Sequence, residues 1–548
     1  MKKNYTLALA SAFLLWLAWP PMPFTAPILF LALVPLLVAA ENIIEKEGQK
    51  KGSKIFRTSF LCFVVWNTAC IYWVFNSLHA VMPTWMAAII SIIPFTLGSL
   101  LLTIAFWLYF RVRLVSSRWW AYAALVCFWL GAEYLHQTWD LSFPWMNLGN
   151  GFAGMHYFVQ WYEFTGVYGG TYWVLMSNIL LFEAWLKYKK LKATSISHPR
   201  NQYHLLVGRT IAHILLPVFL SLWMYYSYKE KPNPANVVVV QPNIDPYAKF
   251  GSMPAARQIE KLIRLSDSLG QADTEYFIWP ETAIAKDTEE EAIRTDSNFL
   301  NVQSFLNKYK NGNVLTGIES FTLYKAAKTK TARPNANGGY FDVFNAAIQI
   351  ENSPRVQFYH KSKLVPGVEQ IPFAEQLAFL KPVFQAFGGS AGSYGKQEKA
   401  SVFYSQSGVG SAPVICYESI WGEYVADYVQ QGAQFIAIIT NDAWWGNTSG
   451  KDQHLLYAKL RAIETRRWVA RSANTGISAF INQRGDIVQR STWWTSTALK
   501  SDINLNDEQT FYVRYQDYIA ITGSAGSGLF GVFLIISSFK RNKSIPIN

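Results

Sequence analysis

The sequence has few charged residues and few cysteines for its length. Asp, Glu, Lys and Arg make up 16% of the 548 residues, whereas about 25% is usual in a soluble protein. There are 4 cysteines, and all but one lie in long apolar segments, so a disulfide framework is not expected. There is no Cys-x-x-Cys pair, and no Gly-rich phosphate loop follows a strand-like run. Neither a metal nor a nucleotide cofactor is therefore expected.

Long hydrophobic runs occupy the first 230 residues and the last 30. Eight of these runs are long enough, or nearly so, to cross a bilayer as helices. They cover residues 5–20, 24–40, 58–78, 85–110, 119–136, 169–186, 210–228 and 518–539. The second run follows the first without a small-residue cleavage site, so a cleaved signal peptide is not expected. The pattern predicts a polytopic α-helical membrane bundle of about eight spans.

The net charge of +13 is distributed as in a membrane protein rather than along a nucleic-acid groove. Lys and Arg cluster at both termini and in the connections 41–57, 111–118 and 187–209, whereas the connections 21–23, 79–84 and 137–168 have none. This alternation predicts that both termini are cytoplasmic and that the long polar segment after the seventh run is extracytoplasmic. No nucleic-acid partner is expected.

The long polar segment has strand-like runs that alternate with helix-like runs. Strands are predicted at 237–241, 276–279, 314–317, 344–350, 414–416 and 435–440, and helices at 254–270, 419–431 and 451–473. This alternation is typical of an α/β domain with buried strands. We therefore expect seven membrane helices in residues 1–231, an α/β domain in 232–516, and a last membrane helix with a cytoplasmic tail in 517–548.

Three predicted strand ends carry groups suited to acyl transfer. Glu281 and Lys361 each follow a strand-like run, and Cys416 lies between a strand-like run and a helix-like stretch. A helix N-terminus favours a thiolate and can bind an oxyanion. A carboxylate base, a fixed cation and a thiol form a complete set for this chemistry. Each residue also has a plainer interpretation, as a helix cap, a surface charge and a small core residue respectively.

Aromatic residues crowd the uncharged connection 137–168, with Trp145 and Trp161 among them. Such residues commonly anchor a protein at the membrane surface, and they could also form a wall of a lipid site. Glu133 and Glu183 lie in or near predicted spans, where a partnered carboxylate is expected. A transport role for these two glutamates leaves a transporter with an external binding domain as an alternative.

Several motifs follow one another in a characteristic order. They are Trp-Pro-Glu (279–281), Lys-Ser-Lys-Leu-Val-Pro-Gly-Val-Glu (361–369), Cys-Tyr-Glu (416–418), Thr-Asn-Asp-Ala-Trp-Trp-Gly (440–446), Gln453-His454, and the stretch from Arg461 to Gly476. With these motifs the chain resembles the apolipoprotein N-acyltransferases, membrane members of the nitrilase (carbon–nitrogen hydrolase) superfamily. The resemblance covers nearly the whole length. It implies a nitrilase-like αββα sandwich for the catalytic domain, on the periplasmic side of the bacterial inner membrane.

The resemblance also implies roles for individual residues. Glu281 is expected to be the general base and then the acid, and Cys416 the residue that carries a thioester-linked acyl chain. Lys361, helped by the backbone N–H of Tyr417, is expected to stabilise the tetrahedral intermediate. Supporting roles fall on Glu369 and Glu418, besides Tyr417.

Two features near Lys361 leave details open. Lys363 is a rival for the cation, although the eight-residue spacing from Lys361 to Glu369 fits the family. The family usually reads Leu-Val-Pro-Phe-Gly-Glu, whereas this chain has Gly367-Val368 before Glu369. The position of the Glu369 carboxylate is therefore uncertain from the sequence.

The activity implied by the resemblance is lipoprotein N-acylation. An acyl chain passes from a membrane phospholipid to the enzyme thiol and then to the N-terminal amine of a diacylglyceryl-cysteine on a lipoprotein. No cofactor is needed, and a monomer is expected. The candidates for lipid contact are Trp145, Trp161, Trp444 and Trp445. The alternative within the superfamily is a membrane-bound amidase that uses the same triad with water as acceptor.

Overall fold

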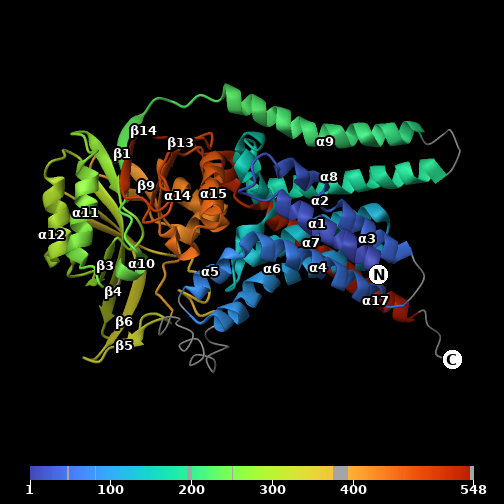
Figure 1. Ribbon diagram of the computed structural model, residues 1–548, viewed down its shortest axis with the longest axis horizontal. Coiled ribbons are helices and arrows are strands. Elements are labelled where there is room, and N and C mark those ends of the chain that lie inside the picture. The colour runs from blue at the N-terminus through green and yellow to red at the C-terminus, as the bar shows by residue number, and fades with distance from the viewer. Residues whose placement is uncertain (46–48, 81, 194–199, 250, 374–392, 544–548) are drawn as a thin grey trace. The chain divides into compact units, whose positions relative to one another are not determined.

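A helical unit and an α/β unit make up the chain (Figure 1). The computed structural model describes residues 1–45, 49–80, 82–193, 200–249, 251–373 and 393–543. The helical unit comprises Met1–Phe75, Trp85–Ser227 and Asp517–Asn548, and the α/β unit comprises Asn76–Thr84 and Tyr228–Gln516.

Long apolar helices build the helical unit. They are α1 (Lys2–Leu17), α2 (Leu29–Ala32), α3 (Val34–Glu45), α4 (Lys51–Ile71), α6 (Thr84–Arg113), α7 (Arg118–Thr138), α8 (Tyr162–Ala193), α9 (Arg200–Ser227) and α17 (Tyr518–Lys543). A short helix, α5 (Trp73–His79), follows α4, and the 3₁₀ helices η1 (Ala26–Ile28), η2 (Pro144–Met146) and η3 (Leu148–Phe158) complete the set. In Figure 1, α8 and α9 run side by side as a long pair.

The eight predicted runs all lie largely in these helices. Within the described residues, four stretches are long and apolar enough to cross a membrane. They are Ala26–Glu45, Thr84–Arg113, Asn201–Ser227 and Tyr518–Lys540, and a fifth is added if α4 and α5, bent by 57°, form one span. A chain with several apolar helices is thus confirmed, and the number of eight spans stays a prediction.

Close contact between α7 and α17 depends on small residues. A side chain added at Gly523 would place its Cβ 2.6 Å from Leu130, and one added at Gly526 would place its Cβ 2.6 Å from Cys127. Ser527 donates a hydrogen bond to the Cys127 carbonyl at 2.7 Å. Helices pack this closely in membranes because small residues let the backbones approach.

Two sheets form the centre of the α/β unit. The described strands of the larger sheet are ordered β14-β1-β2-β4-β6-β5, with β3 paired to β4 and β7 to β6. Their bounds are β1 (Pro234–Gln241), β2 (Thr274–Ile278), β3 (Ile284–Glu289), β4 (Asn313–Tyr324), β5 (Arg333–Pro334), β6 (Tyr340–Glu351), β7 (Val356–His360) and β14 (Thr497–Asn504). The second sheet is ordered β13-β12-β11-β10-β9-β8. Its strands are β8 (Phe403–Tyr404), β9 (Gly410–Ile415), β10 (Phe435–Thr440), β11 (Val469–Ala473), β12 (Ala479–Ile481) and β13 (Ile487–Arg490).

Helices cover the outer face of each sheet (Figure 1). On the larger sheet lie α11 (Ala255–Asp267) and α12 (Ser297–Leu306), and Ile259 and Leu262 of α11 belong to the core cluster with the strands. On the second sheet lie α14 (Gly422–Gln430) and α15 (Ser449–Thr465). Between the sheets, the rings of Tyr276 and Phe435 meet edge to face at 5.2 Å. The α/β architecture expected from the sequence is therefore confirmed as helix, sheet, sheet and helix layers.

Two helix predictions in this unit need correction. The helix predicted at 451–473 is wrong beyond Thr465, because Arg466 adopts a left-handed backbone (φ +49°) and β11 begins at Val469. Buried residues continue across this boundary, and neither Gly nor Pro marks it, so the sequence pattern did not reveal it. The helix predicted at 419–431 is two elements, η6 (Cys416–Ile420) and α14, separated by the extended backbone of Trp421.

Candidate active site

Cys416 lies at the turn between β9 and η6. The sequence predicted Cys416 as the last residue of the strand, but it is the first residue of η6. Its φ of +49° is left-handed. A non-glycine residue in this region is strained, and such strain concentrates at functional turns. Burial and the nearby Glu281 carboxylate raise the pKa of the thiol well above its usual range, although Lys361 opposes this. The resting sulfur is thus a neutral thiol.

Lys361 lies beyond the end of β7 and contacts two carboxylates. Its Nζ is 2.8 Å from Oε1 of Glu369 and 3.2 Å from Oε1 of Glu281, and the residue is only 1% exposed. Burial would lower its pKa, but the charges of Glu369, Glu281 and Cys416 together raise it well above the usual value. Lys361 is therefore a permanent, fixed cation.

Asn345 on β6 joins the same three residues. Its Nδ2 donates to Oε1 of Glu281 at 2.9 Å and to Oε1 of Glu369 at 2.8 Å, and its carbonyl accepts from the Lys361 N–H at 2.9 Å. One residue of β6 thus holds both carboxylates and the backbone of Lys361 in place. Asn345 was not among the residues predicted from the sequence, since an amide within a strand carries no spacing signal.

Glu281 lies in the turn after β2. This turn packs so closely against β4 that only glycine fits at the facing position. A side chain added at Gly317 on β4 would place its Cβ 2.6 Å from the Glu281 Cα and 2.3 Å from the Thr282 N. Thr282 itself has a left-handed φ of +48°. The backbone of β4 therefore defines where the Glu281 turn lies.

Glu369 reaches the site despite the unusual residues before it. Gly367, with φ of +80°, forms a turn in which its N–H donates to the carbonyl of Gln370 at 2.8 Å. The second oxygen of Glu369 accepts from the Val365 N–H at 2.8 Å. The Gly367-Val368 departure from the family pattern therefore leaves the carboxylate in contact with Lys361.

Glu418 connects the end of β9 with the loop that carries Lys361. One carboxylate oxygen accepts from the Ile415 N–H at 2.9 Å, and the other accepts from the N–H groups of Ser362 at 2.6 Å and Lys363 at 3.2 Å. The Tyr359 hydroxyl donates to it at 2.6 Å. Burial raises the pKa of Glu418, and these donors oppose the rise. Glu418 therefore acts on the geometry of the site.

The other candidates nearby have different surroundings. Lys363, the rival cation, has its Nζ over the Tyr424 ring at 5.1 Å, and within the described part of the chain it forms no ion pair with a triad carboxylate. The ring of Tyr417 is buried and meets Trp421 edge to face at 4.7 Å.

A buried network lies behind the Cys416 backbone. His454 contacts the Cys416 carbonyl at 3.2 Å and the Ser419 hydroxyl at 2.9 Å through Nε2, and its Nδ1 is 3.0 Å from Asp442. Arg471 donates to Asp442 at 2.6 Å. The motifs that contain these residues were recognisable in the sequence, but their spacing predicted no role for them.

The four tryptophans proposed for lipid contact fall in both units. Trp444 and Trp445 are half-buried in η7 (Asp442–Trp445), where the Trp445 ring meets His454 at 5.1 Å. Trp145 is fully buried in the helical unit against Trp73 at 4.8 Å, and Trp161 meets Trp173 edge to face at 5.4 Å. Packing within each unit accounts for these positions.

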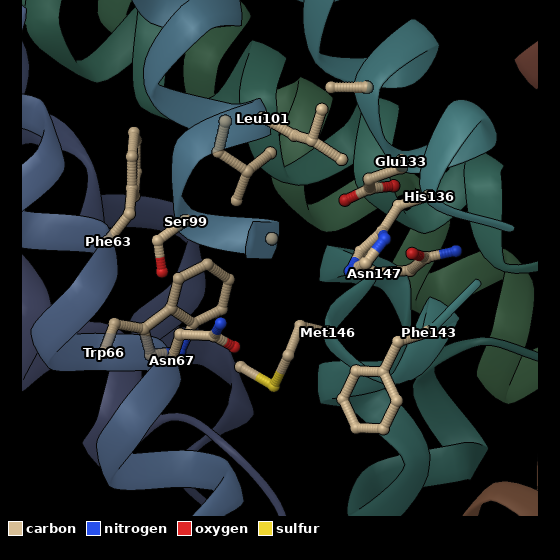
Figure 2. Close-up of a pocket in the computed structure, with 13 residues that line it drawn as sticks. Phe63, Trp66, Asn67, Ser99, Leu101, Glu133, His136, Phe143, Met146 and Asn147 are labelled. Carbon is tan, nitrogen blue, oxygen red and sulfur yellow. The ribbon is translucent and has the colours of Figure 1, made fainter. Parts of the chain in front are cut away.

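The two membrane glutamates have several partners. Glu133 accepts from the Trp129 indole at 3.0 Å, the Leu148 N–H at 2.9 Å and the Thr171 hydroxyl at 2.8 Å. It lines a small pocket of the helical unit with His136 and other side chains (Figure 2). Glu183 accepts from Tyr122 and pairs with Arg118. The simpler interpretation, partnered carboxylates, thus accounts for both.

The comparison with known proteins assigns both units. Residues 236–512 match the carbon–nitrogen hydrolase family. The chain belongs to the carbon–nitrogen hydrolase family. Residues 11–180 match the apolipoprotein N-acyltransferase N-terminal domain, which is not part of the hydrolase core.

Full-length relatives narrow the assignment within the carbon–nitrogen hydrolases. The apolipoprotein N-acyltransferase of Chlorobaculum tepidum is 28% identical, with 99% of this chain and 98% of the relative covered. That of Geobacter metallireducens is 26% identical, with 96% and 94% covered. Among solved structures, a nitrilase-superfamily protein of Saccharomyces cerevisiae aligns with 53% of this chain and 96% of its own, at 15% identity and a TM-score of 0.35. The predicted resemblance to the apolipoprotein N-acyltransferases is confirmed, and with it an N-acyltransferase enzyme.

Proposed function

We propose that this chain transfers a fatty acyl chain from a membrane phospholipid, through a thioester on Cys416, to the N-terminal amine of a diacylglyceryl-cysteine lipoprotein. The observation that carries the proposal is the buried contact of Lys361 with both Glu281 and Glu369. The charges of Lys361 and Glu281 act on the Cys416 thiol. The N-acyltransferase relatives, which align over nearly the full length, supply the class of reaction.

The first half-reaction forms the thioester. Because the thiol is protonated at rest, Glu281 takes the Sγ proton as sulfur attacks the ester carbonyl of the phospholipid. Lys361 and the Tyr417 N–H stabilise the tetrahedral oxyanion. When the C–O bond breaks, the leaving alkoxide takes the proton from Glu281, and a lysophospholipid departs.

The second half-reaction reverses these proton transfers. The lipoprotein amine attacks the thioester carbonyl, and Glu281 accepts the proton that the amine loses. The C–S bond then breaks and sulfur takes up the proton, which restores the thiol. No cofactor takes part, since the residues supply the base, the nucleophile and the oxyanion donors.

The proposed setting is the bacterial inner membrane. Both substrates are anchored in lipid, which places the reaction at the membrane. From the apolar runs and the placement of Lys and Arg we infer about eight spans, cytoplasmic termini and a periplasmic catalytic domain. The proposed division is 1–231, 232–516 and 517–548, acting as a monomer. Contact with the acyl chain is proposed separately for Trp145 and Trp161 in the helical unit and for Trp444 and Trp445 in the α/β unit, because aromatic rings exclude water from a hydrocarbon chain.

Mass spectrometry of the intact protein, incubated with phospholipid carrying a labelled acyl chain, tests the proposal. A fatty-acyl mass on the peptide that contains residue 416 is expected, and it should be lost in Cys416→Ser. The matched control is Cys127→Ser in α7, which should keep the adduct. Acylation of the Cys416→Ser enzyme at a residue other than 416 would refute the nucleophile. Release of ammonia from simple amides without any lipid-derived adduct would instead favour the amidase.

A further inference from the structure

A second buried lysine lies beside the turn that carries Glu281. Lys249 ends the short helix α10 (Pro246–Lys249) and is 2% exposed. Its Nζ donates to the Glu281 carbonyl at 2.8 Å and to the Thr282 hydroxyl at 2.7 Å. A buried ammonium is costly unless it is hydrogen-bonded and balanced by an opposite charge. The two hydrogen bonds meet the first condition, and a nearby carboxylate must meet the second.

The segment that carries Lys249 is itself fixed. Gln258 of α11 is fully buried, and its Nε2 donates to the carbonyls of Lys249 at 2.8 Å and Met253 at 2.9 Å. The Lys249 N–H donates to the Asp245 carbonyl at 2.9 Å. The ammonium is thus held at the Glu281 turn by its own backbone as well as by its side chain.

The charges of the site give this lysine a purpose. Lys361 contacts two carboxylates, Glu281 and Glu369, so these three buried groups together carry a net charge of −1. Lys249 adds a positive charge on the backbone side of Glu281, and its own charge interacts with Glu281 and Glu319. Lys249 and Lys361 then place two positive charges beside Glu281 and Glu369, and a nearby positive charge favours the ionised form of a carboxylate.

We propose that Lys249 is a positioning residue for acyl transfer, which anchors the turn bearing Glu281 and keeps its carboxylate ionised. The proposal rests on the proposed function, in which Glu281 is the general base. Lys249 does not touch the reacting atoms. It acts through Glu281, by hydrogen bonds to the turn and by charge.

The protonation of Lys249 agrees with this role. Burial lowers its pKa to about 7, while Glu281 and Glu319 act in the opposite direction. The ammonium is therefore charged throughout the acid range in which a carboxylate takes up protons. An uncharged replacement therefore removes the positive charge in the pH range in which a carboxylate takes up protons.

Other titratable groups also face this part of the site. Beyond Lys361 and Glu369, the charge of Glu281 acts on Cys416, which Asp442 also faces from the second sheet. On the Lys249 side lies Glu319, whose pKa is raised by burial and by Asp287 and lowered by the Tyr394 hydroxyl, which donates at 2.8 Å, and by Lys249 itself. The same residues are present in every Lys249 variant, and Glu281 and Glu319 are the carboxylates on which the charge of Lys249 acts.

The test is the pH dependence of Cys416 alkylation by iodoacetamide, followed on the residue-416 peptide of the full-length protein. Because the thiol needs Glu281 to remove its proton, the rate should fall on the acid side as Glu281 is protonated. In Lys249→Gln, which keeps an N–H donor without the charge, the acid limb should move up by about one pH unit, with rates about tenfold lower on that limb. Lys249→Arg should keep the wild-type limb.

The matched control is Lys459→Gln. Lys459 is another buried lysine of the α/β unit. Burial lowers its pKa to about 8, and the charge of Asp486 opposes this change. Its replacement therefore tests the removal of a buried cation that does not contact the Glu281 turn. Its acid limb should stay in place. An unshifted limb in Lys249→Gln, or an equal loss of rate at every pH, would overturn the proposal.

This experiment needs no lipid, so it separates the two proposals. Lipid-dependent acylation in Cys416→Ser at a residue other than 416 would refute the proposed function whatever the alkylation profiles are. A wild-type profile in Lys249→Gln, with the acyl adduct intact in the wild type, would refute only the role of Lys249.

Discussion

Replacing Lys361 by methionine should damage stability and catalysis in ways that a second substitution can separate. In Lys361→Met, the facing oxygens of Glu281 and Glu369 lose the ammonium 3.2 and 2.8 Å away. Both oxygens remain hydrogen-bonded to the same Asn345 amide nitrogen. Two buried negative charges are then held close together without their cation.

The expected loss of stability is large. Removing one partner of a buried ion pair costs about 3–5 kcal/mol, because the remaining charge is uncompensated. Adding Glu369→Gln removes one of the two carboxylates and with it their mutual repulsion, which recovers part of this loss. The double variant should therefore unfold at a higher temperature than Lys361→Met.

The expected loss of activity does not recover in the same way. Loss of one oxyanion donor slows catalysis about 10²–10³-fold, and Glu369→Gln supplies no new donor. The double variant should thus be more stable than Lys361→Met but equally slow. Thermal unfolding in detergent and the rate of adduct formation on Cys416 measure the two effects.

Two results would contradict this reasoning. Recovery of the acylation rate in the double variant would mean that Lys361 serves only to neutralise the carboxylates. An unchanged unfolding temperature in Lys361→Met would mean that the two buried carboxylates do not depend on its charge.

Three further predictions concern the surroundings of the site. Glu418→Ala leaves the Ile415 N–H and the other donors unsatisfied and frees the lysine loop, so acylation should fall about 10²-fold; a normal rate of adduct formation would exclude a positioning role. Gly317→Ala forces a Cβ within 2.6 Å of the Glu281 Cα, so the domain should unfold at a lower temperature; an unchanged unfolding temperature would show that the Glu281 turn does not depend on this close approach. In Glu281→Gln, alkylation of Cys416 depends on the rare thiolate, so its rate should rise about tenfold per pH unit through pH 9 instead of levelling off; a level profile there would show that the base is another group.

Hydrophobic runs and polar motifs in the amino-acid sequence specify much of this protein. Runs of uncharged residues long enough to span a bilayer are helical in the structure, because a backbone in lipid must satisfy its own hydrogen bonds. The strand-like runs of the polar segment became strands because apolar residues filled both faces. Glu281, Lys361 and Cys416 were candidates from the sequence because Glu281 and Lys361 follow such runs and Cys416 ends one.

The tertiary structure decided what linear spacing does not encode. Lys361 rather than Lys363 contacts the two carboxylates, since the backbone after β7 turns one side chain toward Glu281 and the other over Tyr424. Asn345 and Lys249 were recognised only in the structure, because an amide in a strand and a lysine at the end of a short helix form no sequence pattern. Their importance comes from neighbours far along the chain, which only folding brings within hydrogen-bonding distance.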